Sequence, residues 1–145
     1  MKKDLTIHFV FVLAFFILFS VYRNWLNVSF FPFWFGALLG TLLPDIDYLL
    51  YVYVIKPNES VSREAAALIS QKKVVKTWDI LIGGFDDKRG LLIHNASFQA
   101  LFLVFAVWII TSGNLMGMGL VLAFMLHLIL DQVGDLLETG KFDKW

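Results

Sequence analysis

The sequence contains no cysteine, only three prolines and no excess of charge of either sign. Without cysteine, disulfide bonds, thiolate zinc sites and thiol nucleophiles are all excluded. Twelve basic side chains balance twelve acidic ones, and no long basic block occurs, so nucleic acid is not expected as a partner. Apolar residues are abundant instead: 59% of the 145 residues are hydrophobic, against about 45–50% in soluble domains, and the mean hydropathy is +0.73. This composition predicts an integral membrane protein.

Four segments are long and apolar enough to cross a bilayer as helices of about 20 residues. They are Leu5–Tyr22, Phe30–Val54, Leu91–Thr111 and Leu115–Leu137. Short connections join the first segment to the second and the third to the fourth, whereas residues 56–90 form a long polar loop between the two pairs. We therefore expect an all-α fold: an integral membrane four-helix bundle of two antiparallel transmembrane hairpins, forming a single transmembrane domain over residues 1–145.

Lys and Arg collect on one side of this topology. They occur at both termini and throughout the 56–90 loop, while Arg23 stands alone on the opposite side. Because basic residues favour the cytoplasmic side, both termini and the loop are expected in the cytoplasm, with the protein in a bacterial or archaeal cytoplasmic membrane. Within the loop, Ser62 is expected to begin a helix that runs to about Lys76. That helix would either rest on lipid headgroups or form a lid over a site.

Two carboxylates, Asp45 and Asp47, interrupt the second apolar segment, which contains no Lys or Arg. A charged side chain at the centre of a membrane helix costs about 2.5–3.5 kcal/mol, so either a cation lies between these acids or one of them stays protonated. In a regular helix the two side chains would point about 200° apart. Pro44 lacks a backbone donor and disturbs the preceding turn. A helix break at Pro44 would allow both carboxylates to reach one cavity. Gly36 and Gly40, four residues apart, predict that another helix packs closely on the same segment.

All three histidines lie near the cytoplasmic ends of the expected spans. His8 follows the start of the first span, His94 opens the third, and His127 lies in the second half of the fourth. Asp131 follows His127 by four residues, so the two side chains share one helix face. Taken singly, each histidine is compatible with an ordinary packing role, and His127 with a simple hydrogen bond to Asp131.

Taken together, these side chains predict a metal site near the inner leaflet, because a divalent metal ion is the simplest counter-charge for the carboxylates. Nitrogen and oxygen donors without sulfur suit zinc, manganese or iron. Either one ion with further carboxylates orienting the imidazoles, or two ions about 3.5–4 Å apart, would use this donor set. The expected metal ligands are His8, Asp45, Asp47, His94, His127 and Asp131.

Four motifs carry a family resemblance in the order in which they occur. They are His8, the block GALLGTLLPDID (residues 36–47), the block RGLLIH (residues 89–94) and the block HLILD (residues 127–131). The chain resembles the YdjM-like family, described as LexA-binding, inner membrane-associated and predicted to be metal-dependent hydrolases. The resemblance implies metal-site roles for the six residues named above, and Arg89 matches a basic residue before the family's histidine. Tyr48 departs from the pattern, since a histidine is expected there, and so does Asn95, where Ser is usual.

The expected function is a membrane-bound metal-dependent hydrolase acting on an ester or phosphoester of a lipid or lipid-linked substrate at the cytoplasmic face. Asp47 or Asp131 would act as the base, and Arg89 would pair with a phosphate. Two alternatives stay open: a metal or proton carrier, and a non-catalytic regulatory or scaffold protein that retains a metal site. The expected partners are membrane lipids, a lipid-linked substrate and a second copy of the chain.

Overall fold

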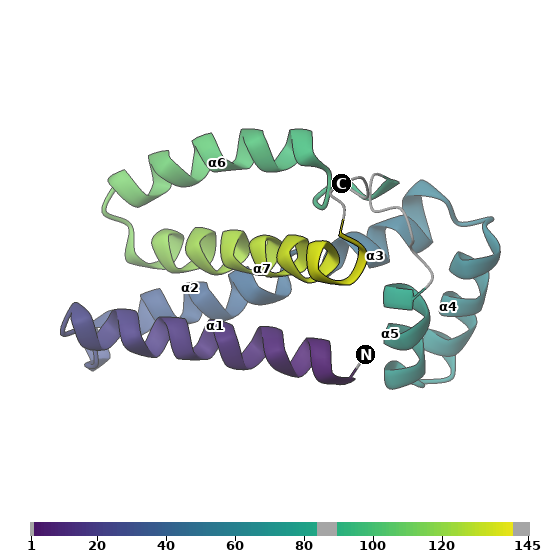
Figure 1. Ribbon diagram of the computed structural model, residues 1–145, viewed down its shortest axis with the longest axis horizontal. Helices are drawn as coiled ribbons and strands as arrows, with labels where there is room; N and C mark the ends of the chain where they lie inside the picture. The colour runs from purple at the N-terminus through teal and green to yellow at the C-terminus, as the bar shows by residue number, and fades with distance from the viewer. Residues whose placement is uncertain (1, 84–89, 141–145) are drawn as a thin grey trace.

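The computed structural model describes the backbone of residues 2–83 and 90–140, and side chains within residues 9–81, 90–137 and 140. All regular structure in these residues is helical, which confirms the expected all-α class (Figure 1). The elements in chain order are α1 (Lys2–Tyr22), the 3-10 helix η1 (Val28–Phe30), α2 (Phe31–Leu42), α3 (Ile46–Leu50), the π-helix η2 (Tyr51–Ile55), α4 (Ser60–Ser70), α5 (Val74–Gly83), α6 (Ala96–Thr111) and α7 (Leu115–Thr139).

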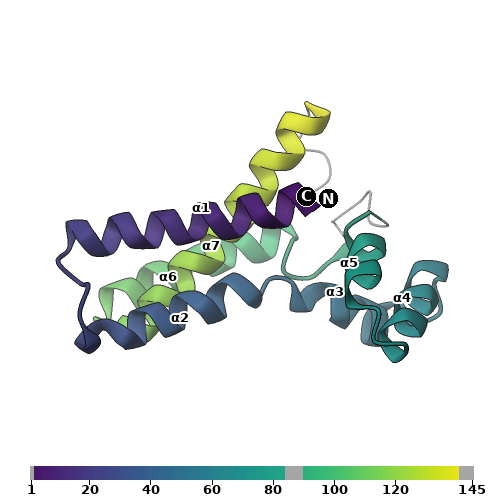
Figure 2. The same ribbon diagram turned by 90° about the horizontal axis from the view of Figure 1, so that it is seen from below.

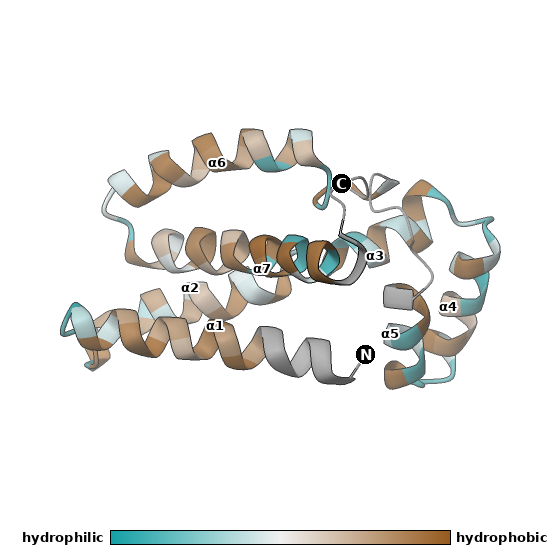
Figure 3. Cartoon of the chain, viewed as in Figure 1, coloured by the Kyte–Doolittle hydropathy of each residue, from teal (hydrophilic) through white to brown (hydrophobic). Residues whose placement is uncertain are grey.

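The helices form an elongated bundle with a cap at one end. Helices α1, α2 and α6 and the first part of α7 follow the long axis, whereas α4 and α5 lie beyond α3 at one end (Figures 1 and 2). Apolar residues dominate α1, α2, α6 and α7, and polar residues concentrate in the α4–α5 hairpin and in a part of α7 (Figure 3). The bundle and the cap therefore differ in chemistry as well as in direction.

Only one helix in the described part of the chain, α7, is long and apolar enough by itself to cross a membrane, over Leu115–Leu137. Val28–Leu42 and Ile46–Ile55 reach that length only as a pair bent by 42°. The apolar parts of the other two, Phe9–Tyr22 and Ala96–Thr111, are shorter. Length and composition thus give one span, or two if the bent pair counts as one, and the expected four-span bundle is not confirmed.

Helix α6 begins five residues later than the expected third span because Asn95 caps it. The Asn95 side chain accepts a hydrogen bond from the backbone N–H of Ser97 at 2.8 Å, which satisfies one of the unpaired donors of the first turn. The preceding residues, including His94, therefore lie in a connection rather than at the start of the helix. This connection is free to approach the α2–α3 junction.

Helices α2 and α7 touch through glycine. A Cβ atom added at Gly36 would lie 2.0 Å from the carbonyl oxygen of Met116, and one at Gly40 would lie 2.1 Å from that of Leu120. From the other side, a Cβ at Gly119 would lie 2.0 Å from the Phe33 carbonyl oxygen. Small residues allow helix backbones to approach this closely. The close packing predicted from Gly36 and Gly40 is confirmed, and α7 is the helix that packs there.

The polar loop contains two helices, so the single helix expected from Ser62 to Lys76 is wrong in its bounds. Helix α4 starts at Ser60 with Glu59 as its N-cap and ends at Ser70. Lys72 then adopts a left-handed backbone with φ of 57°, and its N–H donates to the carbonyl of Ile69 at 2.9 Å, which ends the helix.

The α4–α5 hairpin packs its apolar side against the rest of the protein. A buried cluster joins α3 and η2 to the two hairpin helices and to Leu91, with Trp78 against it; its members are Tyr48, Tyr51, Val52, Ala65, Leu81 and Leu91. The loop is therefore a cap seated on α3 and η2.

Candidate metal centre

A break between α2 and α3 sets the positions of the two acidic residues. Helix α2 ends at Leu42, and the buried Pro44 has no N–H with which to continue it. The Asp47 N–H instead donates to the Pro44 carbonyl at 3.1 Å, and the Ile46 N–H donates to the Leu43 carbonyl at the same distance. These tighter turns confirm the predicted break. They carry Asp45 and Asp47 to two different imidazoles.

Asp47 is fully buried and is held by the connection before α6. Its Oδ1 accepts the N–H of Leu92 at 3.0 Å, and its Oδ2 accepts the N–H groups of Ile93 at 2.6 Å and of His94 at 3.1 Å. A carboxylate that accepts several backbone N–H groups is stabilised in its charged form. Asp47 therefore fixes the course of residues 92–94 across the α2–α3 junction.

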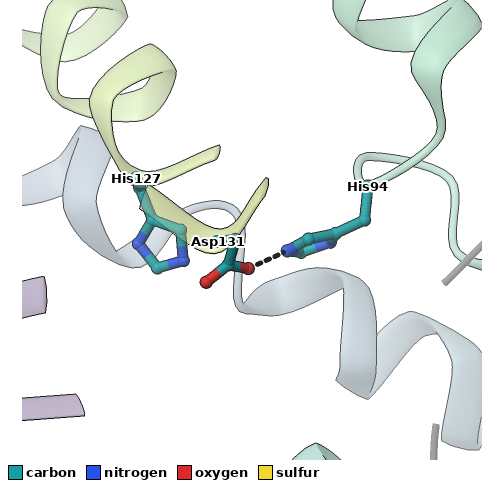
Figure 4. A group of neighbouring side chains, drawn as sticks. All are labelled: His94, His127 and Asp131. Carbon is teal, nitrogen blue, oxygen red and sulfur yellow. Dashed lines mark ion pairs between the residues drawn. The ribbon is translucent and has the colours of Figure 1, made fainter. Parts of the chain in front are cut away.

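The imidazole of His94 lies between two carboxylates. Its Nδ1 is 3.2 Å from Asp47 Oδ2. Its Nε2 is 3.3 Å from Asp131 Oδ2, and the dashed line in Figure 4 marks this second contact. The ring itself is fully buried. Metal-binding histidines characteristically direct one ring nitrogen to a carboxylate, which sets the tautomer and leaves the other nitrogen for the ion. Asp47 occupies the first of these positions for His94.

Helix α7 presents His127 and Asp131 from one face, one turn apart, toward His94 (Figure 4). One ligand atom from each of His94, His127 and Asp131 lies within 4.8 Å of the others, and both histidines are buried. Asp45 approaches from the α2–α3 break, with Oδ1 3.6 Å from His127 Nε2. The predicted sharing of one face by His127 and Asp131 is confirmed.

These donors fit a divalent metal ion. Zinc–nitrogen and zinc–oxygen bonds of about 2.0–2.2 Å in a tetrahedron separate neighbouring ligand atoms by roughly 3.3–3.6 Å. The separations of 3.3 Å between His94 and Asp131 and of 3.6 Å between His127 and Asp45 have this size. The group His94, His127 and Asp131 could thus hold a metal ion, with Asp45 beside it. Nitrogen and oxygen donors alone do not decide between zinc, manganese and iron.

Tyr48 and Trp78 cover the centre on the side of the cap. The Tyr48 ring is buried, with its centroid 5.5 Å from that of His94. Trp78 of α5 packs edge-on against Tyr48 at 6.3 Å. Tyr48 occupies the position where the family resemblance led us to expect a histidine, and here it acts as a wall between His94 and the α4–α5 hairpin.

Two glutamines that were not predicted from the sequence link helix α7 to the backbone of His94. Gln132, next to Asp131, donates a hydrogen bond to Gln99 Oε1, and Gln99 Nε2 donates to the His94 carbonyl oxygen at 3.4 Å. Gln99 is the only strongly polar side chain between Ser97 and Thr111, in a helix that is otherwise apolar. A lone amide in an apolar helix is a sign of an interhelical hydrogen bond, and it could have been found in the sequence.

Two of the expected site residues fall outside this description. The backbone of His8 lies in α1, but its side chain is outside the described residues, and so is the whole of Arg89. The structure therefore brings together Asp45, Asp47, His94, His127 and Asp131 from three separate parts of the chain.

An ionic contact ties the base of the cap to η2. Glu59 accepts a hydrogen bond from the Tyr51 hydroxyl at 2.8 Å and lies 2.8 Å from Lys56 Nζ. The hydrogen bonds from Lys56 and Tyr51 lower the pKa of Glu59, and the hydrogen bond to Glu59 contributes most to raising the pKa of Lys56.

Comparison with known proteins adds no assignment: no family model, no curated protein and no solved structure matches this chain.

Proposed function

We propose that this protein is an integral membrane, metal-dependent hydrolase that acts on an ester or phosphoester of a lipid or lipid-linked substrate. The observation that carries the proposal is the chain of contacts from Asp47 through the His94 ring to Asp131, with His127 alongside. Such a carboxylate–imidazole arrangement is the usual support of a bound metal ion. Because its four motifs occur in the same order as in the YdjM-like family, we propose that the chain is related to that family.

In this proposal His94, His127 and Asp131 hold one divalent ion, with zinc or manganese as the first choices. When bound, such an ion acts as a Lewis acid and lowers the pKa of water toward neutrality. Asp47 accepts three backbone N–H groups besides the imidazole contact, so it orients His94 rather than exchanging protons. Asp45, which is 23% exposed and lies beside His127 Nε2, is the better placed carboxylate to accept a proton from water.

The membrane arrangement that we propose has four crossings: α1, the bent pair from α2 to η2, α6 with the residues before it, and α7. Apolar side chains cover the outer faces of α1 and α6, where Leu18, Leu101 and Val104 are each about 70% exposed. A helix that is apolar on all sides is typical of a membrane environment when it is not buried in protein. The distribution of Lys and Arg supports cytoplasmic termini and a cytoplasmic cap.

Elemental analysis of the detergent-purified full chain tests the metal centre. We expect about one equivalent of zinc, manganese or iron in the wild-type protein, and background levels in the double variant His127→Ala/Asp131→Ala. Asp79→Ala, which removes an exposed carboxylate on α5, is the matched control and should retain the metal. Metal content that is unchanged in the double variant would refute the centre.

Hydrolysis is tested separately on vesicles that contain ester and phosphoester lipids, with the protein loaded with zinc or manganese. Release of product by the wild type, and its loss in the double variant, is the expected result. A protein that keeps its metal but releases no product from any of these lipids would favour the regulatory or scaffold alternative. Metal uptake by protein-containing vesicles without hydrolysis would favour the carrier.

A further inference from the structure

A groove lies between α1 and α2, with a volume of about 110 Å³. Helix α1 contributes Phe9, Leu13 and Phe16 to its lining, and α2 contributes Trp34, Leu38 and Thr41. The Thr41 hydroxyl already donates to the Ala37 carbonyl at 2.9 Å, so the lining is almost entirely apolar in character. Nothing in this lining is suited to bind a charged or strongly polar ligand.

The outer rim of the groove is open to the surroundings of the bundle. Phe9, Leu13 and Leu38 are between 43% and 55% exposed, on helices whose outer faces are apolar. In the proposed membrane arrangement these side chains meet lipid tails. A hydrocarbon chain could therefore enter the groove sideways without leaving the apolar phase.

The inner side of the groove is formed by a buried apolar cluster that also contacts helix α7. Val12, Phe16 and Ala37 belong to a buried cluster against which Leu126 and Leu130 of α7 are packed. These two leucines immediately precede His127 and Asp131 in the sequence. Thr41, at the end of α2, precedes Asp45 by four residues across the break at Pro44. The groove thus leads from the outer surface of the bundle to an apolar cluster, and the α7 residues that flank the site pack on this cluster.

The other approach to the centre is covered. Tyr48 lies against the His94 ring, and the α4–α5 hairpin packs on Tyr48 through Trp78. The hairpin sits at the end of the bundle beyond α3, whereas α1 and α2 extend away from it (Figures 1 and 2). The α1–α2 groove and the cap are therefore two separate approaches, and on the cap side Tyr48 and Trp78 pack over the His94 ring.

From these observations we infer that the groove holds one acyl chain of the substrate. The substrate is then a membrane lipid and not a water-soluble ester. Its ester or phosphoester bond reaches the site from the side, out of the bilayer. The inference rests on the proposed function. The small volume suits part of a single unbranched chain, because sites that enclose a whole small molecule usually have about 300–1,000 Å³.

Close packing of the chain against the groove walls, and not the hydrophobic effect, would retain the chain in the groove. Lipid tails are as apolar as leucine, so moving a chain from the bilayer into the groove yields little hydrophobic free energy. Its effect is to hold the chain so that the bond next to the headgroup lies at the level of Asp45 and His127. A filled groove should therefore impair the placement of long-chain lipids without disturbing metal binding.

Photo-crosslinking of the full chain tests this inference. The protein is reconstituted in vesicles of phosphatidylcholine and phosphatidylglycerol with a trace of phosphatidylcholine that carries a diazirine in one acyl chain. After illumination, mass spectrometry locates the label. We expect the groove residues of α1 and α2 to carry about tenfold more label than Leu101 and Val104 on α6, which are more exposed.

Two groove-filling variants, Leu38→Trp from α2 and Leu13→Trp from α1, should each reduce the label on α1 and α2 to the level found on α6. Val104→Trp is the matched control on α6, and it should leave the groove label unchanged. Using both groove variants guards against misfolding of one of them. Equal labelling of the groove and of α6, or groove labelling that both folded variants retain, would overturn the inference.

The two proposals fail in different ways. His127→Ala/Asp131→Ala should lose the metal and keep the groove label, because the groove lining is unchanged. If the wild type binds metal but shows uniform labelling, the acyl-chain inference fails and the proposed function stands. If labelling is confined to the groove but the wild type holds no metal, the proposed function fails and the groove remains an acyl-chain site.

Discussion

Asp47 and His94 meet with both side chains fully buried, and the Asp47 Oδ2 atom lies 3.2 Å from His94 Nδ1. The same carboxylate accepts the backbone N–H groups of residues 92–94. One acidic side chain thus determines the path of the connection before α6 and the direction in which the imidazole points. The candidate metal centre and the fold share this contact, so a change at Asp47 should affect both.

Asp47→Asn is expected to reduce stability and metal affinity together. The amide keeps one oxygen acceptor but places an N–H₂ group against backbone N–H donors, which leaves buried donors unpaired at a cost of about 1–3 kcal/mol. Loss of the carboxylate that supports His94 should weaken metal binding about 10–100-fold. Thermal unfolding in detergent and metal titration measure the two effects.

Asp45→Asn is the control for Asp47→Asn. Because Asp45 lies beside His127, its replacement should lower metal affinity. Because Asp45 is 23% exposed, the unfolding temperature should change little. The role assigned to Asp47 would be refuted if its variant unfolded at the wild-type temperature and bound metal with wild-type affinity.

Gly40→Ala is expected to separate α2 from α7. The added Cβ would lie 2.1 Å from the Leu120 carbonyl oxygen, which is backbone and cannot rotate away. Overpacking of this kind costs about 1–3 kcal/mol, and the shift should also move His127 relative to Asp45. Chemical denaturation in mixed micelles gives the stability, and metal content reports on the centre.

Gly134→Ala is the matched substitution within α7. A Cβ at Gly134 meets nothing within 4 Å, so only the helix propensity changes, and the variant should gain up to about 1 kcal/mol. Equal losses at Gly40 and Gly134 would show that backbone contact between α2 and α7 does not explain the effect.

Gln99→Leu is expected to loosen the link between the connection at His94 and helix α7. Interhelical hydrogen bonds in membrane proteins contribute about 0.6 kcal/mol on average and up to about 1.7 kcal/mol. The variant should lose this amount of stability and bind metal more weakly, because His94 and Asp131 are then held by separate elements. A double-mutant cycle with Gln132→Leu isolates the interaction free energy between the two glutamines. Strictly additive effects on metal affinity would rule out the coupling.

The features that follow from local spacing could be predicted from the sequence. Pro44 cannot donate to the preceding turn, so the break between Asp45 and the end of α2 follows from its chemistry. The four-residue separation of His127 and Asp131 places them on one helix face. The pair Gly36 and Gly40 indicated a close helix contact, although not that α7 makes it.

Contacts between distant parts of the chain could not be predicted in the same way. The donors to Asp47 are backbone N–H groups of Leu92, Ile93 and His94, which lie at sequence separations of 45, 46 and 47 from it. Backbone N–H groups have no signature in the sequence. The start of α6 at Ala96 depends on Asn95 acting as a cap. The separation of α4 from α5 depends on a left-handed lysine at position 72, where sequence patterns favour glycine.

Glu59→Gln is expected to destabilise the cap in a pH-dependent way. Hydrogen bonds from Lys56 and Tyr51 lower the pKa of Glu59 from its ordinary value of 4.5, so the contact stabilises the fold above that pH and is lost as the pH falls through the lowered value. The raised pKa of Lys56 sets the other limit, because its contribution is complete below 10.5 and is lost above its folded value.

The difference in unfolding temperature between the wild type and Glu59→Gln should therefore be constant near neutral pH and shrink on acidification below pH 4.5. Glu64→Gln, which changes an exposed residue of the same helix, serves as the control and should show a much smaller difference. Because both partners of the Lys56–Glu59 ion pair are about half exposed, the effect should also diminish with added salt. A difference that grew as the pH fell would mean that the ionised form of Glu59 does not hold the cap on η2.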